Sequence, residues 1–291
     1  MPAFTSPTHA LTNGTRRRAT GLPQRLARTA TAALTAIGLT LGAASAQAQE
    51  ALEFAIAPFL PENELTEAYT PVAEYLSDEI GQPVELKVYP SYLAFWEATR
   101  GGSDYDIVLD AAPVTDFRAQ RQDWRVLARF DGEVTQSLVT REDDLVFSPT
   151  ELVNEPVAVQ PSPSVSALVL YQLFPNPVQQ PRLVFRETNR DVAQAVIDEE
   201  VRAAVMPTPL VGGYRELYTV MTTESLPFLA FSVSPGVAPR TANALQDALL
   251  SFGDTAEGQQ ILRSQNLTDI VRANNRLYRG HSELLQGTYG Y

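Results

Sequence analysis

The order of apolar patterns along the chain constrains its fold more than any other feature of the 291 residues. Short apolar runs rich in β-branched residues, typical of buried strands, alternate with longer segments whose apolar residues recur at helical spacing. The first strand-like runs are 52–57, 84–88 and 107–109, and the helical segments between them end at Gly81 and at Gly101. A β-α-β-α-β order predicts a largely parallel sheet covered by helices, which is an α/β fold.

A second set of the same kind follows. The strand-like runs 157–159, 183–185 and 203–206 alternate with helical segments that end near Phe174 and Glu199. Two α/β units predict two lobes, each a sheet flanked by helices, with a ligand cleft between them.

The last helical segments, 241–252 and 256–264, have no unit of their own. The economical arrangement returns the chain to the first lobe, so we expect these helices to complete it. The predicted division is lobe 1 from residues 49–139 plus 229–291, and lobe 2 from residues 140–228.

Residues 1–48 predict a secretory signal peptide that takes no part in the fold. Five arginines precede the first acidic residue, an apolar run covers residues 30–44, and two small-x-small sites, Ala44-Ser45-Ala46 and Ala46-Gln47-Ala48, follow it. We therefore expect cleavage near Ala48 and export. The apolar run is too short to span a bilayer stably, so no membrane insertion is expected after cleavage.

Charge and cysteine content exclude several classes of function. Without the five arginines of the signal, 17 basic residues stand against 34 acidic ones, a formal net charge of −17. Such a charge argues against nucleic acid and anionic lipid as partners. The chain has no cysteine, and His281 is the only histidine after the signal. Thiolate sites are excluded, and any histidine-based metal or catalytic site would rest on that one residue. We expect no cofactor, no metal and no catalytic residue.

The stretch 156–174 is the first candidate for a binding site. A buried strand is followed by two prolines, a serine-rich loop and an apolar segment with helical spacing. The start of a helix has unpaired N–H groups and partial positive charge, and the hydroxyls of Ser162, Ser164 and Ser166 add donors, so an anion could bind there. Alternatively, Ser164 only caps the helix and the other two serines are solvated. The residues alone leave both interpretations open.

Five stretches carry a resemblance to a known family. They are A-Y-T-P-V-A-E-Y-L-S-D-E-I-G-Q-P-V-E-L (68–86), Y-L-A-F-W-E-A-T-R-G-G-S-D-Y-D-I-V-L (92–109), P-V-A-V-Q-P-S-P-S-V-S-A (156–167), L-P-F-L-A-F-S-V-S-P-G-V (226–237) and A-L-L-S-F-G-D-T-A-E-G-Q-Q-I-L (248–262). Their order and spacing resemble the periplasmic solute-binding proteins of the phosphate, phosphite and phosphonate type. The resemblance implies the two-lobed type II periplasmic-binding-protein fold, a periplasmic location and solute binding in place of catalysis.

The resemblance also implies ligand residues. In that family a serine-rich loop grips the ligand's oxyanion, and Ser164, Val165 and Ser166 fall where the family often has Ser-Thr-Ser. Asn189 falls where phosphonate binders tend to have histidine, and it can donate a hydrogen bond without becoming cationic. Thr208 lies in the segment 206–209, where an acidic partner for a ligand amine would be expected, and no carboxylate is present there.

Three further candidates come from the first unit. Tyr92 matches an aromatic residue that opens the family's first cleft helix, although its spacing also suits packing in the core. Phe59 lies in the loop after the first strand, which faces the cleft or the solvent. Asp110 ends its strand and either caps the next helix or reaches the ligand.

These observations favour a monomeric receptor that captures a small oxyanion or phosphonate-like solute. As the resemblance implies, an ABC permease in the inner membrane would receive the solute. A membrane sensor kinase is an alternative partner. A hydrolase with paired carboxylates is an alternative function, which a cleft lined by two facing carboxylates would favour.

Overall fold

The computed structural model describes residues 50–102 and 104–291, and the expected signal peptide lies outside them. The strands are β1 Leu52–Ile56, β2 Val84–Lys87, β3 Ile107–Asp110, β4 Arg125–Phe130, β5 Glu133–Val134, β6 Gln136–Arg141, β7 Pro156–Val159, β8 Arg182–Phe185, β9 Ala203–Pro207, β10 Leu217–Thr222, β11 Leu226–Pro227, β12 Ala230–Val233 and β13 Ile270–Arg272. The α-helices are α1 Glu62–Ile80, α2 Tyr92–Thr99, α3 Ala112–Arg121, α4 Val165–Leu173, α5 Asn189–Ile197, α6 Thr208–Val211, α7 Pro239–Ser251, α8 Ala256–Ser264 and α9 Asn275–Tyr278. Short 3-10 helices are η1 Pro149–Leu152, η2 Pro177–Gln179, η3 Phe252–Asp254 and η4 His281–Leu285.

A six-stranded sheet contains the first unit and the end of the chain, in the order β13-β4-β12-β3-β1-β2. Strand β1 pairs in parallel with β2 and β3, as the β-α-β-α-β pattern predicts. Strand β12 is antiparallel to both β3 and β4, and β13 is antiparallel to β4. The sheet is therefore mixed, because the strands that return from the second unit run in the opposite direction.

A five-stranded sheet contains the second unit, in the order β10-β6-β9-β7-β8. Strand β7 is parallel to β8 and β9, whereas β6 is antiparallel to β9 and β10. All of β6 belongs to this sheet, so the expected division after residue 139 falls inside a strand. The connections between the two sheets pair with each other as the short antiparallel ribbon of β5 and β11.

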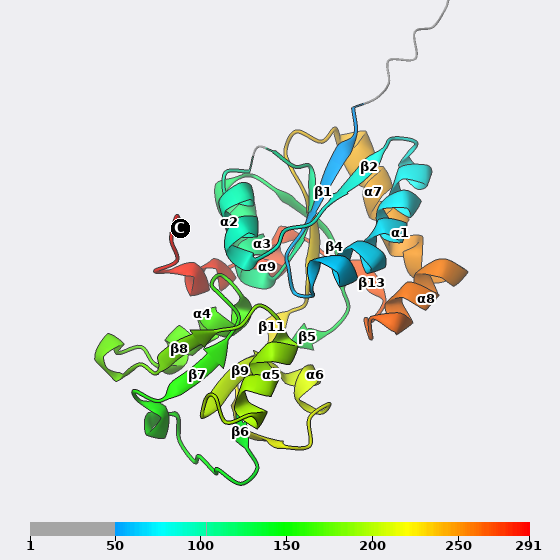
Figure 1. Cartoon of the computed structure of the whole chain (residues 1–291). Helices are drawn as coiled ribbons and strands as arrows, with labels where there is room; N and C mark the ends of the chain where they lie inside the picture. The colour runs from blue at the N-terminus through cyan, green and yellow to red at the C-terminus, as the bar shows by residue number, and fades with distance from the viewer. Residues whose placement is uncertain (1–49, 103) are drawn as a thin grey trace, which may run out of the picture. The chain divides into compact units, whose positions relative to one another are not determined.

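Helices cover both faces of the six-stranded sheet, with α1 and α7 on one side and α2 and α3 on the other (Figure 1). The alternation of β1 accounts for this arrangement, since successive side chains point to opposite faces. Phe54 and Ile56 pack in the cluster that contains α1 and α7, and Ala55 packs with Phe95 of α2. The late helix α7 thus packs on the first sheet.

Local signals place several boundaries. Helix α1 ends at Gly81, whose φ of 66° is the left-handed conformation that glycine adopts at low cost. A capping box begins at Ser148 and opens the 3-10 helix η1. The apolar pattern does not predict the last segments, β13, α9 and η4, although Tyr278 and Leu285 within them are fully buried. None of the helices in the described ranges has the length and hydrophobicity that a bilayer span requires.

Candidate functional site

A pocket of about 230 Å³ is lined by residues from both sheets and from the ribbon between them. From the six-stranded side come Phe59, Leu60, Tyr92, Ala111, Ala112, Phe228, Leu229, Gln265, Asn266 and Leu267. From the ribbon and the five-stranded side come Val134, Gln136, Gln160, Val165, Ser166, Asn189, Pro207, Pro209, Leu210, Leu226 and Pro227. None of these residues is Asp, Glu, Lys, Arg or His, so the lining carries no ionisable side chain other than the phenol of Tyr92.

The first residues of several helices meet at this pocket. Tyr92 begins α2, Ala112 begins α3, Val165 begins α4 and Asn189 begins α5, and all four line it. No described residue accepts a hydrogen bond from the backbone N–H of Val165 or Ser166. Unpaired N–H groups and the aligned peptide dipoles give the N-terminus of a helix partial positive charge. The local field in the pocket therefore favours an anion, although no side chain there is basic.

Neutral polar side chains from the five-stranded side complete this wall. Ser166, 2 % exposed, donates a hydrogen bond of 2.8 Å to Oε1 of Gln136, which is 3 % exposed. Gln160 follows β7 and donates from Nε2 to the carbonyl of Glu187, at 2.9 Å. The Oδ1 atom of Asn189 is buried without a hydrogen-bond partner among the described residues. The amide nitrogen of Gln136 and the amide of Asn189 are thus available to a solute.

Tyr92 adds a hydroxyl from the opposite side. Burial raises the pKa of this phenol above its ordinary value, so the group stays protonated throughout the neutral range. No described residue is hydrogen-bonded to its hydroxyl. The hydroxyl can therefore donate to a bound anion.

Five of the nine residues singled out from the sequence line the pocket: Phe59, Tyr92, Val165, Ser166 and Asn189. Ser162, Ser164, Thr208 and Asp110 do not.

Ser164 is the cap of α4, as one of the two interpretations of the serine-rich loop holds. Its Oγ accepts from the N–H of Ala167 at 3.2 Å and donates to the carbonyl of Gln160 at 2.9 Å, so it turns back into its own loop. The half-buried Ser162 lies outside the lining as well. Thr208 makes hydrogen bonds of 2.8 Å with the hydroxyls of Thr135 and Ser137.

Asp110 neither caps a helix nor reaches the pocket. Its carboxylate is fully buried and accepts two hydrogen bonds, one of 2.7 Å from Nε of Arg118 and one of 2.5 Å from the hydroxyl of Thr115. Both partners belong to α3. The cap of α3 is Ala111, without a side-chain bond. Burial raises the pKa of Asp110, and Arg118 opposes that effect. The expected cap is wrong because a buried arginine holds the carboxylate.

Arg118 is itself fully buried and packed among aromatic rings. Its guanidinium carbon lies 5.1 Å from the ring centre of Tyr105 and 5.7 Å from those of Phe95 and Trp124. It also donates to the carbonyl and hydroxyl of Thr99. The ion pair therefore fixes α3, whose first residue lines the pocket.

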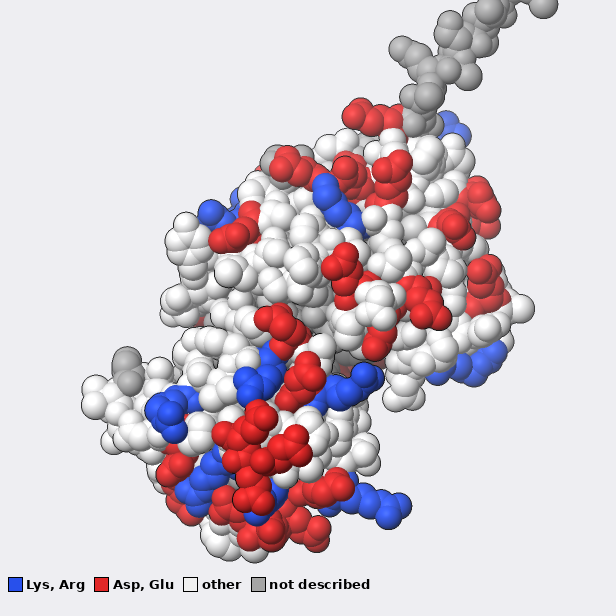
Figure 2. Space-filling model, in the orientation of Figure 1, with Lys and Arg blue, Asp and Glu red and all other residues white. Residues whose placement is uncertain are grey.

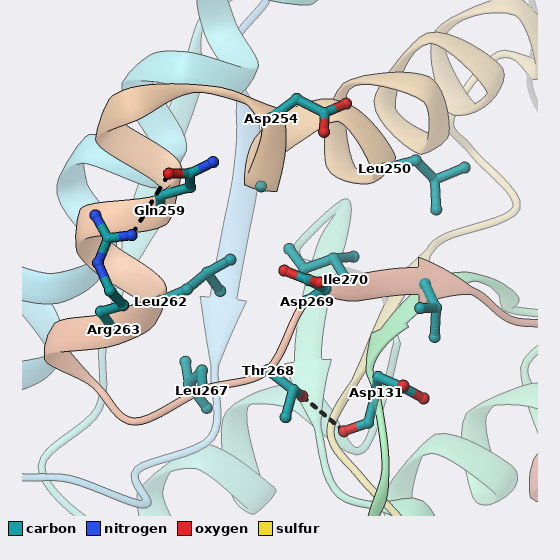
Figure 3. Close-up of a pocket in the computed structure, with 12 residues that line it drawn as sticks. Asp131, Leu250, Asp254, Gln259, Leu262, Arg263, Leu267, Thr268, Asp269 and Ile270 are labelled. Carbon is teal, nitrogen blue, oxygen red and sulfur yellow. Dashed lines mark hydrogen bonds between the residues drawn. The ribbon is translucent and has the colours of Figure 1, made fainter.

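A larger groove of about 910 Å³ lies on the six-stranded side alone, between η3, α8 and the start of β13 (Figure 3). Asp131, Asp254 and Asp269 line it, and Figure 3 shows Arg263 directed along α8 to Gln259, with a hydrogen bond of 3.4 Å. Carboxylates would repel an anion. The described residues form no cluster of three or more His, Cys, Asp or Glu that could hold a metal ion. The smaller pocket is therefore the candidate site.

Structural comparison finds two-lobed binding proteins at low sequence identity. PhnD1 from Prochlorococcus marinus in complex with methylphosphonate has a TM-score of 0.70 and 15% identity, over 81% of this chain and 97% of that one. A binding-protein component of an ABC phosphonate transporter from Pseudomonas aeruginosa has a TM-score of 0.68 and 16% identity, over 81% and 85% of the two chains. At such identities these matches establish the fold. A search of curated proteins found no match.

A family model, described as ABC transporter, phosphonate, periplasmic substrate-binding protein, matches residues 54–278. The match spans both sheets and every pocket residue, and it agrees with the resemblance carried by the five sequence stretches. The chain therefore belongs to the family of periplasmic substrate-binding proteins of phosphonate ABC transporters.

Proposed function

We propose that this protein is a receptor that captures a small phosphonate-like oxyanion in the 230 Å³ pocket and presents it to an ABC permease. The observation that carries the proposal is the meeting of helix starts from both sheets at a pocket without charged side chains. A hydrogen bond to a charged group contributes about 1.5 to 3 kcal/mol, so a few neutral donors suffice for tight binding. The volume lies below the roughly 300 to 1,000 Å³ of sites for drug-sized ligands, in keeping with a small solute.

The pocket is next to the connections between the sheets, which supports capture by hinge closure. Val134 of β5 and Leu226 and Pro227 of β11 line the pocket and belong to the ribbon that joins the sheets. We propose that each sheet is the core of a lobe and that the lobes close about this ribbon. The solute would stabilise the closed form through contacts that it makes with both lobes at once.

The acidic exterior also bears on capture. Acidic side chains lie on both parts of the face seen in Figure 2, and the described residues carry all 34 acidic groups of the chain. The net charge of the described residues therefore does not attract an anion, and we propose that the local field of the pocket does. The lining contains no carboxylate pair, which supports a receptor over a hydrolase that works with two facing carboxylates.

The test is calorimetric titration of residues 49–291 with methylphosphonate, inorganic phosphate and sulfate, together with thermal unfolding, since a ligand of the folded state raises the melting temperature. Asn189→Asp adds one negative charge to the pocket with almost no change of shape. We expect this variant to bind methylphosphonate at least about tenfold more weakly, because a like charge in a partly buried site is repulsive.

The matched control is Gln260→Glu, which makes the same change of charge at an exposed position of α8 outside the pocket. Its affinity should stay within about twofold of the wild type, because exposed charges are screened by salt. Absence of binding by every one of the three anions, or equal affinity in both variants, would overturn the proposal.

A further inference from the structure

We infer that the solute's anionic group carries an uncharged, apolar substituent, and that a substituent bearing an ammonium group is rejected. This inference rests on the proposed function, because it concerns the same pocket. It says which part of the solute contacts the wall on the six-stranded side.

The two walls differ in polarity. The hydrogen-bonding side chains Gln136, Gln160, Ser166 and Asn189 all come from β6, the loop after β7, α4 and α5 of the five-stranded side. The six-stranded side presents mainly aromatic and aliphatic surface, from Phe59, Leu60, Phe228, Leu229 and Leu267. That side also carries the hydroxyl of Tyr92 and the amides of Gln265 and Asn266. A solute that fills the pocket would therefore place its oxygens toward the five-stranded wall and Tyr92, and its carbon against the aromatic and aliphatic part of the six-stranded wall.

The apolar wall is packed onto the core, so it cannot readily turn away. The ring of Phe59 lies edge-on to Tyr69, with centres 6.0 Å apart, and the ring of Phe228 lies 6.1 Å from Phe130. The backbone of Phe228 is also fixed, because its carbonyl accepts a hydrogen bond of 2.9 Å from the hydroxyl of Tyr278. These rings form a preformed surface for an apolar group.

An ammonium group would have no ionic partner here. No carboxylate lines the pocket, and the starts of four helices give the site partial positive charge. Removing a cation from water without an opposite charge is costly. The acceptors that line the pocket are neutral: the amide oxygens of Gln136, Gln160 and Asn189 on the five-stranded side and of Gln265 and Asn266 on the six-stranded side. None of them supplies the opposite charge.

The direct test compares propylphosphonate with 2-aminoethylphosphonate by calorimetry on residues 49–291, with methylphosphonate as the reference. The first two probes have the same number of non-hydrogen atoms and differ in a terminal methyl against an ammonium group. Propylphosphonate should bind at least about fourfold more tightly than methylphosphonate, the ratio expected for one buried methylene. 2-Aminoethylphosphonate should bind more weakly than either.

A charge can be introduced to reverse this preference. Leu60 lines the pocket on the six-stranded side and is partly exposed, so substitution there should not unfold the protein. Leu60→Glu should raise the affinity for 2-aminoethylphosphonate relative to propylphosphonate by at least about tenfold. Leu60→Gln, which has nearly the same shape without the charge, should leave the ratio within about twofold of the wild type.

The outcomes separate the two proposals. If methylphosphonate binds but 2-aminoethylphosphonate binds as tightly as propylphosphonate, the apolar-substituent inference is overturned and the receptor stands. If none of the phosphonates, phosphate or sulfate binds, the proposed function fails and this inference fails with it. Tighter binding along the methyl-to-propyl series, with the ammonium probe weakest, supports both.

Discussion

The two walls of the pocket place their polar groups in opposite ways. On the six-stranded side, the ion pair of Asp110 and Arg118 is buried behind the start of α3, and the surface turned to the pocket is mainly apolar. On the five-stranded side, no charged side chain lines the pocket, and Ser166, Gln136 and Asn189 present neutral hydrogen-bonding groups directly. On the six-stranded side the charged pair holds α3 in place, whereas on the five-stranded side neutral groups face the pocket.

Under the proposed function, the difference implies that a binding site for an anion can be built without a charged side chain in its lining. A basic residue in the pocket would bind any anion strongly and would discriminate little, whereas neutral donors and apolar surface respond to the shape and chemistry of the solute. The stability of the first wall and the affinity of the second should therefore be separable by mutation.

The largest effect is expected from the buried ion pair. Arg118→Met leaves the carboxylate of Asp110 buried without its cation, and breaking such a pair costs about 3 to 5 kcal/mol in the free energy of unfolding. Urea unfolding at pH 7 measures the loss. Arg240→Met, at an exposed position of α7, is the control and should change stability by less than about 0.5 kcal/mol.

The loss of stability in Arg118→Met should also depend on pH. Burial already raises the pKa of Asp110 in the folded protein, and removal of Arg118 raises it further. The folded state then holds the proton more tightly than the unfolded state, so stability falls as the pH rises from the unfolded pKa of about 3.9 through the folded one. The deficit of Arg118→Met should be small near pH 4 and full near pH 7. An equal deficit at both pH values would refute the assignment to a charged Asp110.

An intermediate effect separates two neighbouring serines of the second wall. Ser164→Ala removes the cap of α4 and should cost about 1 kcal/mol of stability, with affinity reduced by less than about threefold. Ser166→Ala leaves Oε1 of Gln136 without its donor, so the amide is no longer oriented, and affinity should fall about tenfold. Calorimetry and urea unfolding on both variants test the pair. A larger loss of affinity in Ser164→Ala than in Ser166→Ala would contradict these two roles and assign the binding role to Ser164.

The smallest effect concerns the exterior. Since neither wall has a charged side chain in the lining, the acidic surface dominates the long-range force on an approaching anion. Salt screens that repulsion, with a Debye length of about 10 Å at 0.1 M. The association rate of methylphosphonate should therefore rise by about twofold between 20 mM and 200 mM NaCl, measured by stopped-flow fluorescence. A falling rate would indicate that a basic group guides the solute.

Much of the fold could be predicted because its elements have regular apolar spacing. The end of the chain could not, since β13 and α9 are too short to show a period. This segment is held by contacts with distant residues: Asp116 of α3 accepts hydrogen bonds of 2.9 Å from the N–H groups of both Gly280 and Ser282. Only the folded structure brings these partners together.

The candidate site divides in the same way. Local signals and the resemblance identified Val165, Ser166 and Asn189, because each lies at the start of a helix. Gln136 was missed, since a glutamine in a strand is more often solvated than buried. Gln160 stands directly before the serine-rich loop, and its position at the end of a buried strand was the signal that could have identified it.

The place of β12 between β3 and β4 has a consequence for the order of folding. The five-stranded sheet uses only residues between 136 and 222, so it can form as soon as that segment is available. The six-stranded sheet lacks an inner strand until residues 230–233 arrive. The middle portion of the chain can therefore complete its sheet before the beginning of the chain can complete its own. Residues 52–130, although first in the sequence, depend for a closed sheet on a strand that lies about 100 residues further on.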